Sequence, residues 1–141
     1  MSNRHTYPAL SFIIPIENGD DLITERINIA FQFLKRYKGS GEIIAISDGA
    51  ANGVYKLAWL TIKLNKTNAP HVRTAMMLHT TQLGLTEIIK TGLSRALGEK
   101  VIVLLNPIRH EKKPEIENLK ELFKGLEITG SLANLETPKI D

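Results

Sequence analysis

The sequence predicts an α/β fold, a three-layer α/β/α sandwich with a mostly parallel sheet. Short apolar runs typical of buried strands alternate about four times with longer stretches of helical periodicity. Strand–helix–strand units of this kind give a mostly parallel sheet, whose strands are joined by right-handed crossovers. The length of 141 residues predicts one domain with a real core. We therefore expect a single domain over residues 1–141, with flexible or edge segments at 1–8 and 133–141.

The first half of the chain begins with a strand and a helix. Leu10–Ile16 is an apolar run typical of a buried strand. Asp20 or Asp21 can cap the helix that follows. This helix has apolar residues at spacings of four, three and four, namely Ile23, Ile27, Ala30 and Leu34. Gly39 stops it, and Glu42–Ser47 is a second buried strand.

The middle of the chain predicts two more helices with a strand between them. A helix from Val54 to about Asn65 has one apolar face, formed by Leu57, Leu60 and Leu64. Val72–His79 is a third strand, after which Thr80 or Thr81 begins another helix. The apolar residues of that helix are Leu85, Ile88, Ile89, Leu93 and Leu97, and it ends at Gly98. On the helix from Val54, Tyr55 and Trp59 are expected to be packing residues.

The last part of the chain predicts the remaining strands. Val101–Leu105 is apolar throughout and is expected to be buried on both faces. Pro114 suits the first turn of a helix whose apolar residues are Ile116, Leu119, Leu122 and Phe123. Gly125 closes this helix, and Leu126–Leu132 forms a last strand. An edge strand there gives the chain a surface for a homodimer.

Composition excludes several classes of function. The chain has no cysteine, so a disulfide scaffold and a cysteine zinc finger are excluded. Its 18 basic and 15 acidic residues nearly cancel, and a net charge of +3 does not indicate a nucleic-acid partner. The beginning of the chain lacks a signal-peptide pattern, and no apolar run is long enough to span a membrane. We expect a cytoplasmic protein.

A ligand site is expected at the carboxyl edge of the sheet, because open α/β sheets bind ligands there, where the strand order reverses. The residues just past the strands are Glu17, Asn18, Gly19, Asp48, Gly49, Asn106, Pro107 and Arg109. Glycines in these positions, here Gly19 and Gly49, most often serve only to allow a turn. The four histidines lack metal-ligand spacing, and His79 is expected to be structural. The loop that begins at Arg109 is expected to be solvated.

Several segments resemble the motifs of one family. SFIIPIENG at Ser11–Gly19 resembles a strand ending in Pro-Val-Tyr-Asn-Glu, and ISDGA at Ile46–Ala50 resembles Asp-Asp-Gly-Ser. An Asn-x-Gly helix start is resembled by Gln82–Gly84, and the Thr-Gly-Leu core of that helix by Thr91–Leu93. A Pro-Glu helix with its following strand is resembled by Pro114–Ser131. Nearly the whole chain thus resembles the N-terminal half of a family 2 glycosyltransferase. It looks most like the branch that adds sugars to polyprenyl phosphates.

This resemblance implies the nucleotide-diphospho-sugar transferase (GT-A) fold and a set of nucleotide-binding residues. The implied set is Pro15, Glu17, Asn18, Asp48, Gly49 and Asn106, with Asp48 matching the aspartate that contacts the base. The family holds a divalent metal on an Asp-x-Asp motif, but Leu104–Ile108 has no carboxylate there, so we expect no metal and no other cofactor. Glu17 replaces the family's tyrosine beside the base, and Ser47 replaces an aspartate.

Three functions follow from the resemblance and its departures. The first is a degenerate glycosyltransferase-like domain, a pseudoenzyme that binds a nucleotide or nucleotide sugar without transferring it. The second is a protein-association domain with no small-molecule site. The third is a metal-independent glycosyltransferase completed by a partner chain, because family members continue past the stretch that this sequence resembles, and that continuation carries the acceptor site. On its own the chain is not expected to be an active glycosyltransferase.

Overall fold

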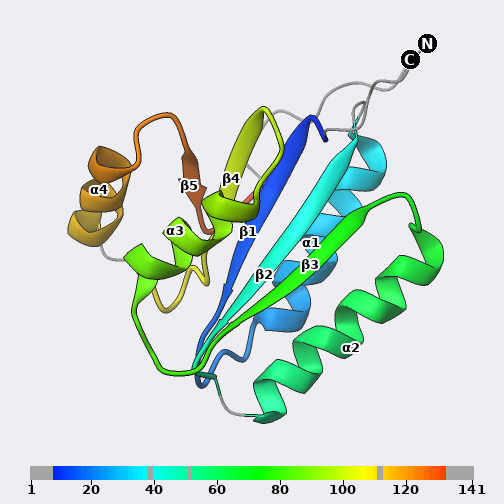
Figure 1. Cartoon of the computed structure of the whole chain (residues 1–141), viewed down its shortest axis with the longest axis horizontal. Helices are drawn as coiled ribbons and strands as arrows, with labels where there is room; N and C mark the ends of the chain where they lie inside the picture. Colours follow the sequence, from blue (N-terminus) through cyan, green and yellow to red (C-terminus); the bar gives the residue numbers. More distant parts are fainter. Residues whose placement is uncertain (1–7, 38–39, 51, 111–112, 133–141) are drawn as a thin grey trace.

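The computed structural model describes residues 8–37, 40–50, 52–110 and 113–132, in which strands and helices alternate along the chain (Figure 1). The strands are β1 (Leu10–Ile16), β2 (Gly41–Asp48), β3 (Arg73–His79), β4 (Lys100–Leu104) and β5 (Glu127–Thr129). The helices are α1 (Ile23–Arg36), α2 (Asn52–Asn68), α3 (Leu85–Arg95) and α4 (Lys113–Leu122). This order confirms the alternation that the sequence predicts.

The five strands form one sheet in the order β3-β2-β1-β4-β5, and every neighbouring pair is parallel. Leu10 of β1 lies opposite Gly41 of β2 on one side and Lys100 of β4 on the other. The chain moves outward from β1 to β3 and then returns to β4, so the strand order reverses between β1 and β4. This all-parallel sheet with its helices confirms the predicted α/β fold class.

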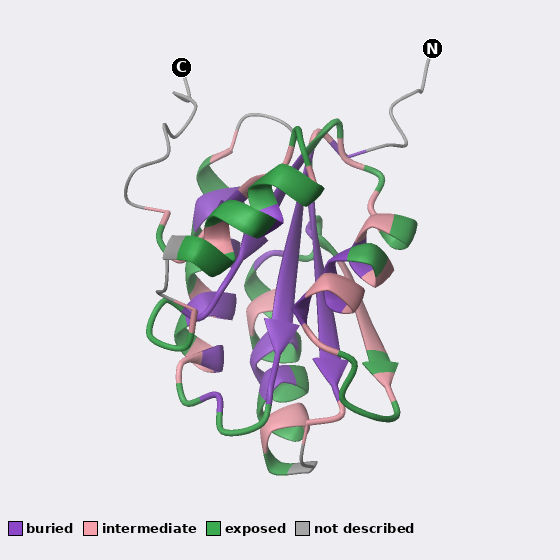
Figure 2. Ribbon diagram, turned by 90° about the vertical axis from the view of Figure 1, so that its left-hand side faces the viewer, coloured by how far each residue is buried: buried purple, intermediate pink, exposed green. Residues whose placement is uncertain are grey.

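Helices cover both faces of the sheet, which makes three layers (Figures 1 and 2). Successive side chains of β1 point to opposite faces, as strand geometry requires. Phe12 and Ile14 pack with α1 and α2, whereas Ile13 packs with Ile88 and Ile89 of α3. Figure 2 shows the central strands buried along their length, in agreement with their continuous apolar runs. Each face of the sheet therefore has its own hydrophobic core.

The predicted element boundaries differ from the structure mainly around α3 and β5. The helix expected from Thr80 or Thr81 begins only at Leu85, because Gly84 has a φ of 98° and interrupts the helical conformation. It ends at Arg95, before the predicted stop at Gly98. The strand expected over Leu126–Leu132 is shorter and covers only Glu127–Thr129.

Two details of α1 and α2 also differ from the expectations. Neither Asp20 nor Asp21 caps α1, since the residue before this helix is Leu22 and it makes no side-chain cap. The predicted apolar face of α2 points to solvent, and the exposed fractions are 46% for Leu57, 50% for Leu60 and 69% for Leu64. The face that packs into the core instead carries the smaller Ala58 together with Thr61 and Ile62.

Trp59 does not pack as the sequence predicts, because it is 44% exposed on the surface of α2.

Some expectations lie outside the described residues, namely the stop at Gly39 and the terminal segments 1–7 and 133–141. Among the residues that the structure describes, no helix is both long enough and apolar enough to cross a membrane.

The close approach of α3 to β1 predicts the effect of one substitution. A Cβ atom at Gly92 would lie 2.7–2.9 Å from three carbons of the buried Ile13 side chain. We expect Gly92→Ala to lower the free energy of unfolding by about 1–3 kcal/mol, despite alanine's better helix propensity. Gly53→Ala in α2 is the matched control, because its Cβ would meet nothing within 4 Å. Urea unfolding measures both, and equal stabilities of the two variants would contradict the packing described above.

Candidate functional site

The candidate site lies at the carboxyl edge of the sheet, where the strand order reverses. Two loops meet there, the one that follows β1 and the one that follows β4. They carry Glu17 and Asn18 on one side and Asn106, Arg109 and His110 on the other. The contacts between these loops decide which groups are available to a ligand.

A buried arginine joins the ends of β1 and β4. Arg26 of α1 has a side chain only 4% exposed and donates hydrogen bonds to Leu104 O at 2.7 Å and to Pro15 O at 2.8 Å. It also forms an ion pair with Asp20, whose side chain is fully buried. Burial lowers the pKa of Arg26, and Asp20 opposes that shift. A buried charge needs such a partner, because losing its water costs several kcal/mol.

Asn106 connects this ion pair to the loop after β4. Its Nδ2 donates to Asp20 Oδ1 at 3.0 Å, and its Oδ1 accepts the backbone N–H groups of Ile108 at 3.0 Å and Arg109 at 3.3 Å. The Asn106 side chain is therefore used on both ends inside the protein. Its role in the structure is to hold the loop that carries Arg109.

A second set of contacts bridges the same two loops nearer to solvent. His110 Nε2 lies 2.7 Å from Glu17 Oε1, and its Nδ1 lies 3.0 Å from Glu115 Oε1. Arg109 donates from Nη1 to Asn18 O at 2.5 Å, and its Nε lies 3.8 Å from Glu17 Oε1. Arg109 is exposed, as expected of a solvated loop, but Arg109 and His110 also contact the loop after β1, which the sequence does not predict.

Asp48, at the end of β2, is engaged by the loop before α3. Its Oδ1 accepts Leu83 N–H at 3.0 Å and lies 2.7 Å from His79 Nδ1, while its Oδ2 accepts Gly84 N–H at 2.9 Å. His79 Nε2 lies 2.7 Å from Thr91 Oγ1, so His79 is structural, as the sequence predicts. Burial raises the pKa of Asp48, but its hydrogen bonds with His79 and the two N–H groups outweigh burial and lower that pKa below the ordinary value.

Gly49 allows this loop to approach β2. Its φ is 66°, and a Cβ atom there would lie 2.8 Å from Gln82 N. Gly49 N–H donates to His79 O at 3.1 Å, and Gly49 O accepts Asn18 Nδ2 at 3.4 Å. Asn18 therefore lies between the Asp48 contacts and the Arg109 contacts.

The structure brings the six predicted residues to one edge but gives most of them internal partners. Pro15, Glu17, Asp48 and Asn106 are buried and are bonded within the protein. Asn18 is exposed, and Gly49 forms a turn. A contact of Asp48 with a base stays a prediction.

Sequence reasoning overlooked Arg26 and His110. Arg26 has one usable signal, since it lies on the same helical face as Ile23 and Ile27, where a charge needs a buried partner. His110 has no such signal, because its contacts depend on how two loops meet.

Among the described residues of this edge, the buried carboxylates already have protein partners. Asn106 and Pro107 follow β4, and the nearest buried carboxylates, Glu17 and Asp20, face His110 and Arg26. Within the described ranges, no group of three histidine, aspartate or glutamate side chains could hold a metal ion. A hard divalent cation prefers several oxygen ligands.

Comparisons with known proteins support the fold. No protein-family model matches the sequence, and no curated protein matches it. Among solved structures, the chain is similar to the mannosyltransferase PcManGT from Pyrobaculum calidifontis in complex with GDP-Man and Mn2+. The TM-score is 0.54 and the identity 18%, over 70% of this chain and 27% of that one. The chain thus has a glycosyltransferase-like α/β fold and spans about a quarter of that neighbour's length.

The buried ion pair predicts a large loss of stability in one variant. Asp20→Asn leaves Arg26 buried without its counter-charge, so we expect the free energy of unfolding to fall by about 3 kcal/mol or more. Glu87→Gln is the matched control, because Glu87 is 47% exposed and pairs with Lys90 at 3.5 Å on the surface. That variant should lose less than about 1 kcal/mol. Both losses would be measured by urea unfolding. Similar losses in the two variants would contradict the expected large contribution of the buried pair to stability.

His110 predicts a pH dependence of stability. Its hydrogen bond to Glu17 raises the pKa of His110, Glu115 adds to the rise, and burial opposes it. A raised folded-state pKa gives stability that is fully present below the unfolded value of about 6.5 and is lost as pH rises through the folded value. His110→Gln should remove this loss from urea unfolding curves taken across that range. The exposed His71 supplies the control His71→Gln, and a loss unaffected by His110→Gln would refute the assignment.

Proposed function

We propose that this domain binds the diphosphate of a nucleotide or nucleotide sugar at the carboxyl edge of its sheet and does not transfer the sugar on its own. The reversal of strand order between β1 and β4 supports this site, because open α/β sheets bind ligands outside such a point. The similarity to a mannosyltransferase solved with GDP-Man is in line with a ligand of this class.

The position of Arg109 carries the proposal. Its guanidinium lies between the loops after β1 and β4, held by Asn18 O, and its side chain is 36% exposed. A guanidinium presents five N–H donors in a planar fork that matches phosphate oxygens. Arg109 would supply the positive charge that the family takes from its metal, and the neighbouring amide of Asn18 would add a polar contact.

The carboxylates of this edge support binding without transfer. Glycosyl transfer to a hydroxyl acceptor is assisted by a group that removes the acceptor's proton. Among the residues that the structure describes at this edge, the buried carboxylates of Glu17, Asp20 and Asp48 are paired with His110, Arg26 and His79. Each is therefore engaged in holding the loops rather than placed as a base.

A thermal-shift titration with GDP, UDP and their sugar derivatives tests the proposal. A ligand that binds only the folded state stabilises it by about 2.7 kcal/mol at 100 times its Kd, enough to raise Tm by several degrees. We expect a saturable rise in Tm that does not need manganese and that Arg109→Gln abolishes. Arg95→Gln, which removes the same charge at the far end of α3, should retain the full rise.

Three outcomes would contradict the proposal. The absence of any rise in Tm with every nucleotide would remove the small-molecule site. A rise in Tm that depends on manganese would show that nucleotide binding requires a metal. Turnover of a nucleotide sugar by the isolated chain would show that the domain is itself a transferase.

The exposed face of α2 favours a second candidate function, association with another copy of the chain. Leu57, Leu60 and Leu64 follow each other at spacings of three and four on the solvent side of α2. This spacing is that of a helix-pairing seam, and an antiparallel pair of such helices would be self-complementary.

Sedimentation velocity tests the association. We expect the wild type to form dimers and the double variant Leu60→Glu with Leu64→Glu to be monomeric, because the charges would lie in the seam. Leu122→Glu on α4 is the control, since Leu122 is 61% exposed and lies away from α2. A wild type that stays monomeric at high concentration would exclude this candidate.

A further inference from the structure

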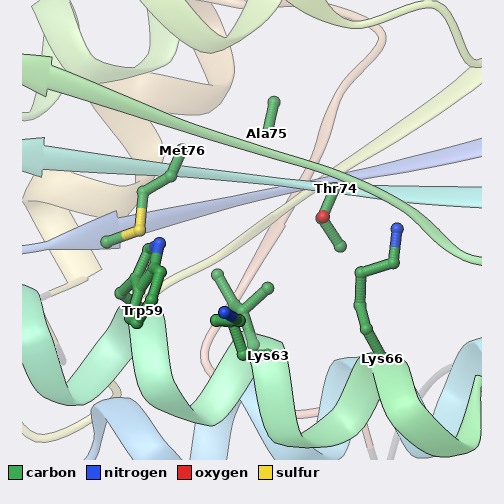
Figure 3. Close-up of a pocket in the computed structure, with 7 residues that line it drawn as sticks. Trp59, Lys63, Lys66, Thr74, Ala75 and Met76 are labelled. Carbon is green, nitrogen blue, oxygen red and sulfur yellow. The ribbon is translucent and has the colours of Figure 1, made fainter. Parts of the chain in front are cut away.

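A pocket of about 280 Å³ lies between α2 and the edge strand β3 (Figure 3). It is lined by Trp59, Ile62, Lys63, Lys66, Thr74, Ala75 and Met76. Figure 3 shows Met76 extending from β3 toward Trp59, with Thr74 directed toward the helix. The floor is apolar, and its volume is near the lower end of the range for small-molecule sites.

Two lysines give the pocket a positive rim. Lys63 and Lys66 are three residues apart on α2, so their side chains lie on neighbouring turns. The Lys63 ammonium lies 4.5 Å from the centre of the Trp59 ring, and Figure 3 shows the Lys66 side chain rising beside Thr74. No carboxylate is among the lining residues, and none of the ion pairs found within the described residues uses either lysine.

The helix itself strengthens this charge. The segment Asn52–Asn68 contains three lysines and no aspartate or glutamate. Trp59 is 44% exposed at the pocket, an unusual position for the largest apolar side chain. An apolar wall beside two cations is complementary to a ligand that has an apolar body and an acidic head.

We propose that this pocket binds a small amphipathic anion, with its apolar part against Trp59, Ile62 and Met76 and its acidic group between Lys63 and Lys66. A carboxylate or phosphate there receives charge-assisted hydrogen bonds from both ammonium groups. The apolar part removes the exposed indole surface from water. This site is separate from the carboxyl edge and does not depend on the function proposed for that edge.

Trp59 provides a direct readout, because it is the only tryptophan in the chain. We would titrate the full chain with decanoate below its critical micelle concentration and follow the indole fluorescence. The matched probes are 1-decanol, which lacks the acid, and acetate, which lacks the apolar chain. We expect a saturable change with decanoate, much weaker binding of decanol and no change with acetate.

Three lysine variants separate the pocket from general attraction to a basic helix. Lys63→Gln and Lys66→Gln should each weaken decanoate binding by about fivefold or more. Lys56→Gln removes the same charge from the same helix, but Lys56 does not line the pocket, so it should change Kd less than twofold. Equal effects of all three variants, or equal binding of decanol and decanoate, would overturn the proposal.

A membrane surface also combines apolar chains with acidic groups, so binding to lipid vesicles is tested in a separate experiment. Phosphatidylcholine vesicles containing phosphatidylserine would be tested by flotation and by the same fluorescence. Binding to these vesicles, without any response to monomeric decanoate, would overturn the pocket in favour of a lipid-surface contact. The absence of a response to either probe would leave the pocket without a ligand of this class and would equally overturn the proposal.

Discussion

The burial of Arg26 is the constraint on which the carboxyl edge of this fold depends. The strands β1 and β4 are neighbours in the sheet, and the Arg26 guanidinium donates hydrogen bonds to both Pro15 O and Leu104 O near their carboxyl ends. A cation can remain at this depth only with a counter-charge. Asp20 supplies that charge, and its place in the loop after β1 fixes where this loop must run.

The same constraint reaches the surface through a short series of hydrogen bonds. Asp20 is bonded to Asn106, and Asn106 holds the backbone of Arg109. The guanidinium of Arg109 then returns to the loop after β1 at Asn18 O. A buried arginine in α1 thereby orders an exposed arginine at the point where the strand order reverses. This relation connects the stability of the core to the position of the proposed diphosphate contact.

Much of the fold could be predicted from local patterns, whereas the pairing within the site could not. The apolar run Leu10–Ile16 coincides with β1, because a strand buried on both faces needs no polar alternation. The apolar face predicted for α2 does not enter the core, since leucine spacing cannot tell a core face from an exposed one when Ala58 and Ile62 offer a smaller alternative. The predicted residues do meet at one edge. That His110 would engage Glu17 depends on two loops far apart in the sequence, and no local pattern records such a contact.

The proposed ligand of the carboxyl edge between β1 and β4 is a nucleoside diphosphate that binds through Arg109. Backbone amide NMR shifts recorded during a titration with GDP and UDP test it most directly. We expect saturable changes confined to the loops after β1, β2 and β4, including Asn18, Gly49 and Arg109. The absence of saturable changes, or changes centred on any other part of the fold, would contradict it.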